Sequence, residues 1–490
     1  MKLSKLAGAA LPGVPHDIDI TGITSDSRQV QPGHLFAALP GTKADGAGFI
    51  PAAVEAGAAA ILAAPDAWVP DGVPVIRDPA PRRRLALMAA AFYPRQPATL
   101  AAVTGTNGKT SVASFLQQIW QAQRLRAASI GTLGVDTGDE TWPLRHTTPD
   151  PVELHGILDR LAVGGVSHAV LEASSHGLAQ HRLDGVRLSA AAFTNISRDH
   201  LDYHPDFESY FAAKMRLFEE VLPPGAPAIV DIDRPEGARV ADIARRRGLD
   251  VWTVGHAGEA IRFSEPVPEG FAQRVDFAVA GTSYTVTLPL AGSFQVANAA
   301  LAAGLALASG SAPEPVFAAI ESLQGANGRM ELAGYAPSGG GIFIDYAHTP
   351  DALESALRAL RPFAGGAVAV VFGCGGERDT GKRAEMGAIA QQLAERIYIT
   401  DDNPRGEDAA MIRQEIMRAA PGARDIPERH NAIAAAIADL GRDDVLLIAG
   451  KGHETGQIVA GKTYPFSDFE AVRGVLQGYA RAGAAPVQTL

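Results

Sequence analysis

The sequence predicts an α/β protein of three domains, and three observations support this fold class. The chain has 490 residues, which is enough for roughly three domains of ordinary size. A glycine-rich loop at 105–110 joins an apolar, strand-like run to a helical pattern. In the last third of the chain, four apolar runs each end in a polar loop. We expect a small α/β N-terminal domain (1–88), a central phosphate-loop ATPase-like domain with a parallel sheet (89–328) and a C-terminal Rossmann-like domain (329–490).

The N-terminal domain is predicted from short strand-like pieces and from one alanine-rich segment, Ile50 to Leu62, whose composition favours a helix. Two polar clusters, at 25–28 and 41–46, predict turns. A helical segment then continues through residue 93. The prolines at positions 94 and 97 interrupt the pattern and separate this part from the central domain.

The segment from Val103 to Thr110 carries the strongest chemical signal, because a strand, a glycine turn and a helix start follow one another. There the backbone N–H groups and the helix N-terminus can face a phosphate chain, while the lysine reaches the outer phosphates and the threonine can ligate Mg²⁺. The motif is a shortened variant, since Val103 replaces its first glycine, and a simple tight turn is the alternative. The pattern favours a nucleotide bound by Gly105, Thr106, Asn107, Gly108, Lys109, Thr110 and Ser111.

Composition excludes several classes of protein. A formal net charge of −11 argues against a nucleic-acid partner. Cys374 is the only cysteine, which excludes a disulfide framework and a cysteine-rich metal site within one chain. The apolar run at 6–11 is too short for a signal peptide, and no run of about 18 apolar residues could cross a bilayer. We expect a soluble, cytoplasmic monomer without membrane insertion.

Two further polar loops follow apolar strands in the central domain. Glu172 ends the run at 168–171, where phosphate-loop enzymes place an acid near Mg²⁺; a surface glutamate is the alternative. The loop at 194–204 contains His200 and His204, whose spacing could also serve zinc. No glutamate of a helical zinc-protease motif lies between them, so phosphate-bound Mg²⁺ is favoured over zinc, with a capped turn as the alternative.

By composition, Lys214 is an ordinary helix lysine, because the residues from Tyr210 to Phe218 alternate between aromatic and aliphatic types at helical spacing. Nothing in the spacing singles it out.

The C-terminal domain is predicted from four strand candidates, at 342–344, 367–372, 397–399 and 445–448. In open α/β sheets, ligands bind beyond the carboxyl ends of the strands, so the four polar loops should gather around one site. The loop after 372 lacks the full dinucleotide-binding pattern, because Arg378 stands where its last glycine should be. A nicotinamide cofactor is therefore not favoured.

Six motifs together resemble those of the Mur ligases, the ATP-dependent amino-acid-adding enzymes of peptidoglycan synthesis. They are GTNGKT at 105–110, EASSHG at 172–177, TNISRDHLD at 194–202, NGRME at 327–331, DYAH at 345–348 and GKGHE at 450–454. The resemblance covers nearly the whole chain. Within this family, SDSR at 25–28, TTP at 147–149 and above all DNPR at 402–405 are similar to the members that add meso-diaminopimelate.

This resemblance implies a function. The protein would add meso-diaminopimelate to the D-glutamate γ-carboxylate of UDP-N-acetylmuramoyl-L-alanyl-D-glutamate through an acyl phosphate, using ATP and Mg²⁺. One domain would hold the UDP end of this substrate, one the ATP and one the amino acid. The lysine-adding form and folylpolyglutamate synthetase are related alternatives, and a nucleotide-binding scaffold without ligase activity is an alternative of another class.

The resemblance also assigns roles to residues. Catalysis would involve Lys109, Glu172, His200 and a carbamylated Lys214, and Mg²⁺ would be bound by Thr110, Glu172, His200 and Lys214. Four further residues would surround the nucleotide: Asn298, Arg329, Asp345 and His348. The UDP-substrate would contact Ser25, Ser27, Thr42, Lys43, Ala44, Thr147, Thr148, Ser174, Gln180 and Arg182.

The choice of amino acid would depend on Arg405. Diaminopimelate carries a distal carboxylate that lysine lacks, and an arginine can bind it through two charge-assisted hydrogen bonds. Without the family resemblance, an Asn-Pro turn followed by a solvated arginine would be preferred. The amino-acid pocket implied by the resemblance consists of Arg378, Asp402, Asn403, Pro404, Arg405, Gly450 and Glu454.

Overall fold

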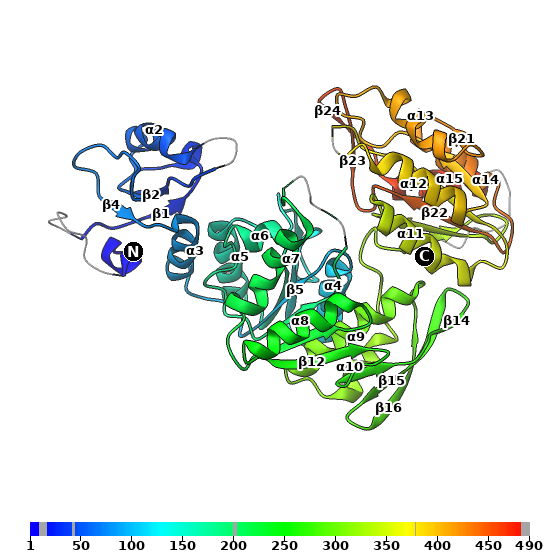
Figure 1. The fold of residues 1–490 in the computed structure, drawn as a ribbon, viewed down its shortest axis with the longest axis horizontal. Coiled ribbons are helices and arrows are strands. Elements are labelled where there is room, and N and C mark those ends of the chain that lie inside the picture. Colours follow the sequence, from blue (N-terminus) through cyan, green and yellow to red (C-terminus); the bar gives the residue numbers. More distant parts are fainter. Residues whose placement is uncertain (9–16, 42–44, 198, 200–202, 378, 482–490) are drawn as a thin grey trace.

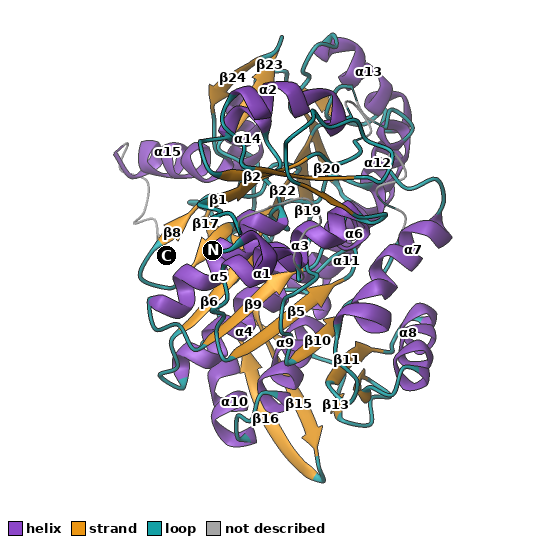
Figure 2. Ribbon diagram, turned by 90° about the vertical axis from the view of Figure 1, so that its left-hand side faces the viewer, coloured by secondary structure: helices purple, strands orange, loops and turns teal. Residues whose placement is uncertain are grey.

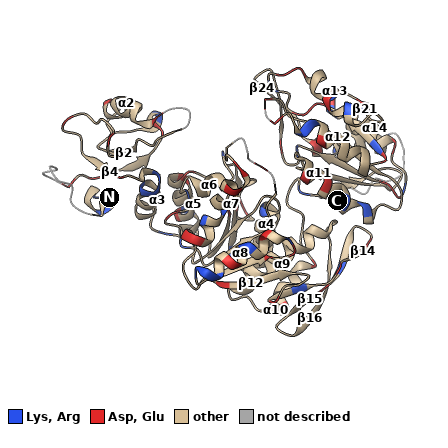
Figure 3. Cartoon of the chain, viewed as in Figure 1, with Lys and Arg blue, Asp and Glu red and all other residues tan. Residues whose placement is uncertain are grey.

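The chain folds into three α/β lobes, each built around its own sheet (Figure 1). The structure is a computed structural model that describes residues 1–8, 17–41, 45–197, 199, 203–377 and 379–481. The predicted fold class is confirmed, whereas the boundaries at 88/89 and 328/329 stay predictions. Lysine and arginine are interspersed with aspartate and glutamate in every lobe (Figure 3). No helix among the described residues is both long and apolar enough to cross a membrane.

The N-terminal lobe contains a four-stranded parallel sheet in the order β1-β2-β3-β4. Short apolar strands, buried on both faces, form this sheet as expected for parallel pairing. Its elements are α1 Leu3–Ala7, β1 Gly22–Thr24, the 3₁₀ turns Ser27–Gln29 and Gly46–Phe49, β2 His34–Ala37, α2 Ile50–Glu55, β3 Ala60–Ala63, β4 Val75–Arg77 and α3 Pro81–Phe92.

The predicted helix from Ile50 to Leu62 is wrong in its second half. Helix α2 ends at Glu55, Gly57 adopts a left-handed φ of +93°, and the chain continues as strand β3. Gly57 ends the helix because a left-handed residue is easily adopted by glycine. All four residues of β3 are buried, and a short, fully buried strand has no polar alternation that would distinguish it from an apolar helix.

The central lobe is built on a twelve-stranded sheet. Its order is β14-β15-β13-β12-β11-β10-β5-β9-β6-β7-β8, with β16 paired to β15. In the order of the sheet, the strands β6, β9, β5, β10, β11, β12 and β13 are parallel. Antiparallel strands extend both edges. Figure 2 shows β6, β9, β5 and β10 side by side between helices.

The bounds of the central strands follow from apolar runs closed by polar or glycine residues. They are β5 Thr99–Thr104, β6 Ala127–Gly131, β7 Gly134–Asp136, β8 Thr141–Trp142, β9 His168–Glu172, β10 Ala190–Phe193, β11 Pro227–Asp231, β12 Asp250–Gly255, β13 Ile261–Phe263, β14 Val267–Glu269, β15 Ala272–Val279 and β16 Thr282–Leu288.

Helices cover both faces of the central sheet. One face packs on α4 and α9 around Phe115, Trp120 and Leu301, and the other on α5, α7 and α8 around Leu158, Phe211 and Val240. The helices are α4 Lys109–Ala122, α5 Pro151–Val163, α6 Ser175–Ala179, α7 Phe207–Arg216 continued by a π-helical turn Leu217–Val221, α8 Pro235–Arg246, α9 Ser293–Ala308 and α10 Pro313–Ile320.

The C-terminal lobe has a six-stranded sheet in the order β17-β18-β22-β19-β20-β21, in which only β17 is antiparallel. A separate hairpin, β23–β24, lies outside it. The strands are β17 Glu331–Tyr335, β18 Gly341–Asp345, β19 Val368–Phe372, β20 Arg396–Ile399, β21 Arg424–Asp425, β22 Val445–Ala449, β23 Gly456–Val459 and β24 Lys462–Pro465. The helices are α11 Pro350–Leu360 with a 3₁₀ turn Arg361–Phe363, α12 Lys382–Leu393, α13 Ala409–Ala419, α14 Arg429–Ala438 and α15 Asp468–Arg481.

An aromatic contact joins the central and C-terminal lobes at a distance from the phosphate loop. Phe271, in the turn between β14 and β15, lies 5.1 Å from the ring of Phe343 and 5.8 Å from that of Tyr335. A Cβ atom on Gly341 would lie 2.4 Å from the Phe271 ring, so this ring fits only over a glycine. The contact fixes one end of the C-terminal lobe against the central lobe.

Candidate active site

The phosphate loop lies between β5 and α4, as the sequence predicts. Gly105 and Gly108 both have positive φ angles, +149° and +84°. A Cβ on Gly105 would lie 1.9 Å from Thr194 Oγ1, and one on Gly108 would lie 2.4 Å from Asn298 Oδ1. Both glycines are therefore required by backbone conformation and by close neighbours.

The segment after β10 supports this loop. The Thr194 hydroxyl donates to the Asn107 carbonyl at 2.6 Å, and the Thr106 N–H donates to the Asn195 carbonyl at 2.8 Å. The Asn107 N–H also donates to Asn195 Oδ1 at 3.0 Å. Neither Thr194 nor Asn195 was singled out as a site residue, although both lie in the motif at 194–202.

Lys109 begins α4 and folds back over its own loop. Its Nζ donates to the carbonyls of Gly105 and Thr106 at 2.8 and 2.7 Å. Burial lowers the pKa of Lys109, the carboxylate of Glu172 opposes that shift, and the charge of Arg329 adds to it. The lysine is thus held beside the loop where phosphates would bind, and the guanidinium of Arg329 lies near enough to affect it.

Glu172, at the end of β9, is only 2% exposed and accepts several hydrogen bonds. The Thr110 hydroxyl donates to both carboxylate oxygens, and Thr132 donates through its N–H at 2.8 Å and its hydroxyl at 3.1 Å. A Cβ on Gly131 would lie 2.1 Å from Glu172 Oε1, so the strand before Thr132 must end in glycine. The prediction missed Thr132, which belongs to no recognisable motif.

This oxygen-rich cluster suits a hard cation. A carboxylate and two hydroxyls are the ligand types that Mg²⁺ prefers, and Mg²⁺ commonly binds through one or two carboxylates together with substrate phosphates. The described part of the chain contains no group of three or more His, Cys, Asp or Glu side chains that could hold a metal ion. Phosphate oxygens and water molecules would complete the coordination of such an ion.

Lys214 is not an ordinary surface lysine of α7. Its side chain is 1% exposed, its Nζ donates to the Gly105 carbonyl at 2.7 Å, and it lies 4.4 Å from the Tyr210 ring centre. Burial, with the nearby charge of Lys109, lowers the pKa of Lys214 well below its usual value. The sequence-based interpretation is corrected here, because helical spacing cannot reveal that this face of α7 lies against the phosphate loop.

The histidine pair considered for zinc is only partly described. His200 lies outside the described residues, so its predicted role cannot be placed in the structure. His204 is buried, with its ring 5.3 Å from Tyr210 and 5.7 Å from His176. His204 and His176 therefore belong to a cluster of rings beside Tyr210 of α7.

Residues of the C-terminal lobe face the phosphate loop from the other side. Asp345 accepts the N–H groups of Met330 and Ala347 at 2.7 and 2.8 Å, and burial raises its pKa although Arg329 opposes the shift. His348 contacts the Tyr346 carbonyl through Nδ1 at 2.9 Å, and burial lowers its pKa to about 4. His348 is therefore neutral at physiological pH.

Arg329 and Asn298 are the other two residues predicted to surround the nucleotide. The Arg329 guanidinium lies 4.4 Å above the Tyr346 ring, and among the described residues its buried Nε has no hydrogen-bond partner. Asn298, on α9, donates to Gln295 Oε1 at 3.1 Å and lies against Gly108. A buried guanidinium N–H without a partner, next to a glycine-rich phosphate loop, suits an anion.

Five of the predicted UDP-substrate residues form one cluster in the central lobe. The Thr148 hydroxyl lies 2.7 Å from the Glu172 carbonyl and 2.9 Å from Ser174 Oγ. The Arg182 guanidinium donates to the Thr148 carbonyl and, at 2.8 Å, to Gln180 Oε1. Thr147 Oγ1 lies 3.1 Å from Thr132 Oγ1. This cluster therefore adjoins the Glu172 site directly.

The N-terminal part of the predicted UDP site lies on another lobe. Ser25 follows β1, and Ser27 begins a 3₁₀ turn capped by Asp26. Within the described residues, no hydrogen bond joins Ser25 or Ser27 to the central cluster. Thr42, Lys43 and Ala44 lie outside the described residues.

The predicted amino-acid pocket forms where β19, β20 and β22 end. Asp402 and Asn403 are buried, and Asn403 Nδ2 donates to Glu454 Oε2 at 2.8 Å. A Cβ on Gly450 would lie 2.4 Å from Asp402 Oδ2, which explains the glycine there. The structure thus brings together loops that are some fifty residues apart in sequence. Arg378 lies outside the described residues.

The loop around Pro404 has an unusual backbone. Asn403 and Arg405 have left-handed φ angles of +43° and +54°, which side-chain-bearing residues seldom adopt. The hairpin supports this conformation, because the Arg405 N–H donates to the Ile458 carbonyl at 3.0 Å and the Ala460 N–H donates to the Arg405 carbonyl at 2.6 Å. The Arg405 guanidinium donates to the Gly376 carbonyl at 2.7 Å.

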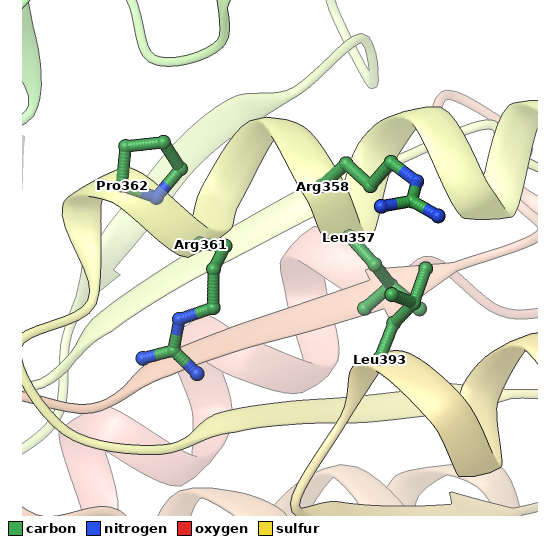
Figure 4. A pocket seen from close by; sticks show the side chains of 5 residues that line it. All are labelled: Leu357, Arg358, Arg361, Pro362 and Leu393. Atoms are coloured by element: carbon green, nitrogen blue, oxygen red, sulfur yellow. The ribbon is translucent and has the colours of Figure 1, made fainter.

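The C-terminal lobe also carries a pocket, and Figure 4 shows the five side chains that line it. It is found where α11 and α12 end, at the opposite edge of the sheet, and it is lined by Leu357, Arg358, Arg361, Pro362 and Leu393. Arg358 pairs with Glu354 at 2.8 Å and Arg361 with Glu395 at 3.0 Å. Because the lining residues lie at the ends of these helices, the pocket is separate from the loops that follow the strands.

Comparison with known proteins identifies the family. The model of the Mur ligase middle domain matches residues 103–306, that of the Mur ligase glutamate ligase domain matches 328–452, and that of the Mur ligase family catalytic domain matches 19–93. A Bradyrhizobium diazoefficiens protein named UDP-N-acetylmuramoyl-L-alanyl-D-glutamate–2,6-diaminopimelate ligase is 53% identical, over 97% of this chain and 99% of that protein. The chain belongs to the Mur ligase family. The family expected from the motifs is thus confirmed.

Other Mur ligases agree with this assignment. A Rhizobium meliloti protein with the same name is 51% identical over 98% of this chain and 100% of its own length. A solved structure of a UDP-N-acetylmuramoyl-L-alanyl-D-glutamate–2,6-diaminopimelate ligase is 29% identical, with a TM-score of 0.74 over 98% of this chain and 99% of that one. A folylpolyglutamate synthase from Thermotoga maritima, at 17% identity and a TM-score of 0.61 over 82% of this chain and 94% of that one, shares the fold alone.

Proposed function

We propose that this Mur ligase joins meso-diaminopimelate to the D-glutamate γ-carboxylate of UDP-N-acetylmuramoyl-L-alanyl-D-glutamate at the expense of ATP. The names of full-length relatives at about half identity support this substrate pair. The observation that carries the proposal is the left-handed Arg405 loop, in which Asn403 donates to Glu454 and the Arg405 guanidinium donates to the Gly376 carbonyl. We infer that Arg405, Asp402 and Glu454 line one pocket. This pocket offers both signs of charge, as a zwitterionic amino acid with an additional carboxylate requires.

The proposed reaction has two steps. An oxygen of the γ-carboxylate attacks the γ-phosphorus of ATP, which breaks the bond to the β-phosphate oxygen and gives an acyl phosphate and ADP. The neutral amine of diaminopimelate then attacks the acyl carbon, and the tetrahedral intermediate expels phosphate while the nitrogen loses a proton. The protein contributes mainly through positioning and charge neutralisation.

The phosphate-binding groups of this chain fit the first step. The loop N–H groups and Lys109 would hold the outer phosphates, and Arg329 would approach them from the C-terminal lobe. Thr110 and Glu172 would bind Mg²⁺, which when bound supplies charge neutralisation at the phosphates. His200 and Lys214 would bind a second Mg²⁺ near the acceptor carboxylate.

Carbamylation of Lys214 fits its surroundings. A neutral lysine amine can add to the carbon of carbon dioxide and release a proton, which leaves a carbamate anion in place of the amine. The lowered pKa of Lys214 increases the fraction of its amine that is neutral. The ammonium of Lys109 lies near enough to lower that pKa, and the same charge would stabilise a carbamate.

Selection of diaminopimelate over lysine would follow from Arg405. In a partly closed pocket, lysine would leave the guanidinium without the carboxylate that it is placed to bind. Sites built for a polar group can reject an analogue that lacks it by factors of about 10⁴. Glu454 and Asp402 would receive the ammonium groups.

We also infer that the chain works as a cytoplasmic monomer with the three domains 1–88, 89–328 and 329–490. Its proposed substrates, ATP and a UDP-sugar peptide, are nucleotides of the cytoplasm. Light scattering coupled to size-exclusion chromatography tests the monomer, and limited proteolysis tests the boundaries.

The reaction is tested with purified protein, Mg²⁺, ATP and UDP-N-acetylmuramoyl-L-alanyl-D-glutamate. Meso-diaminopimelate and L-lysine are offered separately, products are identified by mass, and phosphate release is measured. A tripeptide product formed only with diaminopimelate is expected. Product with lysine would retain the ligase but overturn the role of Arg405, and ATP turnover unaffected by either substrate would favour a non-catalytic scaffold.

A further inference from the structure

Lys451 follows Gly450 at the end of β22 and is fully buried, with 0% of its side chain exposed. A buried ammonium is costly unless hydrogen bonds and opposite charges compensate for the lost water. Its Nζ donates to the Gly456 carbonyl at 2.8 Å and to Asn403 Oδ1 at 3.2 Å. Asn403 is part of the predicted amino-acid pocket, and Gly456 begins strand β23 of the hairpin that supports the Arg405 loop.

Two carboxylates also lie close to Lys451 Nζ. Asp402 Oδ1 is 3.5 Å away and Glu454 Oε2 is 3.6 Å away. These are the two acids to which the pocket owes its negative charge. Two carboxylates that share a site repel each other, and a cation in contact with both reduces this repulsion. Lys451 therefore supplies a fixed positive charge beside the buried Asp402 and the partly exposed Glu454.

Lys451 also determines how the Asn403 amide is oriented. Asn403 Oδ1 accepts from Lys451 Nζ and from the Ile458 N–H at 2.9 Å, and an ammonium can only donate. The amide nitrogen must therefore point the other way, where it donates to Glu454 Oε2 at 2.8 Å. One oxygen of Glu454 is thereby held in place, and its other oxygen accepts no hydrogen bond from the described residues.

The same ammonium links the pocket to the hairpin that supports Arg405. Gly456, which accepts from Lys451, begins β23, and Ile458 on that strand accepts from the Arg405 N–H. A displacement of Lys451 would therefore move the carboxylates of Asp402 and Glu454 and the backbone of Arg405 together. No other lysine or arginine of the described chain contacts Asp402, Asn403 and Glu454 at once.

We propose that Lys451 is a positioning residue for the amino-acid substrate, whose buried ammonium holds Asp402, Asn403 and Glu454 in the arrangement that receives the ammonium groups of that substrate. The inference rests on the proposed ligation of meso-diaminopimelate and adds a residue to its specificity machinery. Lys451 itself does not touch the substrate in this arrangement.

The test compares wild-type protein with Lys451→Met, which keeps an unbranched side chain one atom shorter and removes the charge. KM is measured separately for meso-diaminopimelate, ATP and the UDP-dipeptide, together with kcat and thermal unfolding. The expected result is a KM for diaminopimelate raised at least about tenfold, with the other two KM values within about twofold, because only the amino-acid pocket loses charge-assisted contacts. The preference for diaminopimelate over lysine should narrow as well.

Arg396→Met is the matched control. Arg396 pairs with Asp444 at the opposite edge of the same sheet, so its loss removes a cation of this lobe without altering the pocket. Its KM for diaminopimelate should stay at the wild-type value. If Lys451→Met does not fold, Lys451→Gln removes the charge but keeps a donor, and it replaces the first variant in the comparison.

Each outcome decides the matter. An unchanged KM for diaminopimelate, or an equal loss for all three substrates, would overturn the positioning role, and failure of both variants to fold would assign Lys451 to stability instead. If wild-type protein makes no product with diaminopimelate, the proposed function fails independently of the variants. If the wild type forms product and Lys451→Met keeps the wild-type KM for diaminopimelate, only this inference is overturned.

Discussion

The hydroxyl of Thr110 donates hydrogen bonds to both carboxylate oxygens of Glu172, at 3.0 and 3.1 Å, across a separation of 62 residues. The two meet because β5 and β9 are adjacent parallel strands whose carboxyl ends share one edge of the sheet. A helix N-terminus and an acid are thereby placed together at the end of the phosphate loop.

Glu172→Gln should weaken the response to Mg²⁺. Glutamine keeps the shape of the side chain and the residues around it unchanged, but it lacks the charge that attracts a divalent cation. We expect the Mg²⁺ concentration for half-maximal phosphate release to rise by roughly tenfold or more, as for the loss of a charged contact. Glu140→Gln, at an exposed position of the same lobe, is the control. An unchanged Mg²⁺ titration would remove Glu172 from the metal site.

Lys214→Glu should retain more activity than Lys214→Ala. Glutamate returns an anionic oxygen ligand close to the position that a carbamate would occupy, whereas alanine leaves none. Native mass spectrometry in bicarbonate should show the mass of one added carbon dioxide on the wild type and not on Lys214→Ala. Equal loss of activity in both variants, or no added mass, would refute carbamylation.

Arg405→Ala should abolish the preference for diaminopimelate. Because the guanidinium supplies charge-assisted hydrogen bonds to the distal carboxylate, kcat/KM for diaminopimelate should fall by about 10² or more, whereas that for lysine should change little. Arg405→Lys keeps the charge without the planar fork and should recover only part of the preference. Arg418→Ala, on the exposed surface of α13, should behave like the wild type. A variant at 405 that still selects diaminopimelate contradicts the assignment.

The ion pair between Arg429 and Asp468 should contribute strongly to stability. Its side chains are 2% and 0% exposed, and Arg429 also donates to the Ala449 carbonyl at 2.9 Å. Removing one partner leaves a buried charge, so Asp468→Asn should lower the free energy of unfolding by about 3–5 kcal/mol in urea titrations. Glu470→Gln, which breaks the exposed pair with Arg473 on the same helix, should cost at most about 1 kcal/mol. Similar losses in both variants would be inconsistent with this account.

Stability should fall at mildly acidic pH because of His155. This histidine is fully buried, contacts the Asp184 carbonyl through Nε2 at 3.1 Å, and has its pKa lowered by burial from 6.5 to about 4. Below pH 6.5 the unfolded chain binds a proton that the native state excludes, so the loss grows as pH falls toward 4 and approaches about 3 kcal/mol. His155→Gln should flatten the dependence of unfolding free energy on pH between 7 and 4. His430 is exposed, so His430→Gln should leave the pH dependence of the unfolding free energy unchanged.

The sequence could predict the fold class and the apolar strands whose polar loops gather at one edge of a sheet. Thr110 and Glu172 could be predicted as candidates because one opens a helix and the other ends an apolar strand, and parallel strands collect such positions at one edge. Asp402 could be named only from the family resemblance, because local spacing favours a plain turn there. The strand at 60–63 was missed because a fully buried strand lacks alternation. Lys214, Thr132 and Lys451 depend on contacts between distant segments, so their burial and partners could not be deduced from local spacing.

The contact of Phe271 with Phe343 and Tyr335 constrains how the active site can open. A movement that widened the space between Lys109 and Arg329 by separating the two lobes would expose three aromatic rings to water. Rotation about these rings keeps them covered. The C-terminal lobe is therefore expected to turn around a fixed axis near Phe271, so residues far from this axis, such as those of the β23–β24 hairpin, would travel farther than residues beside it.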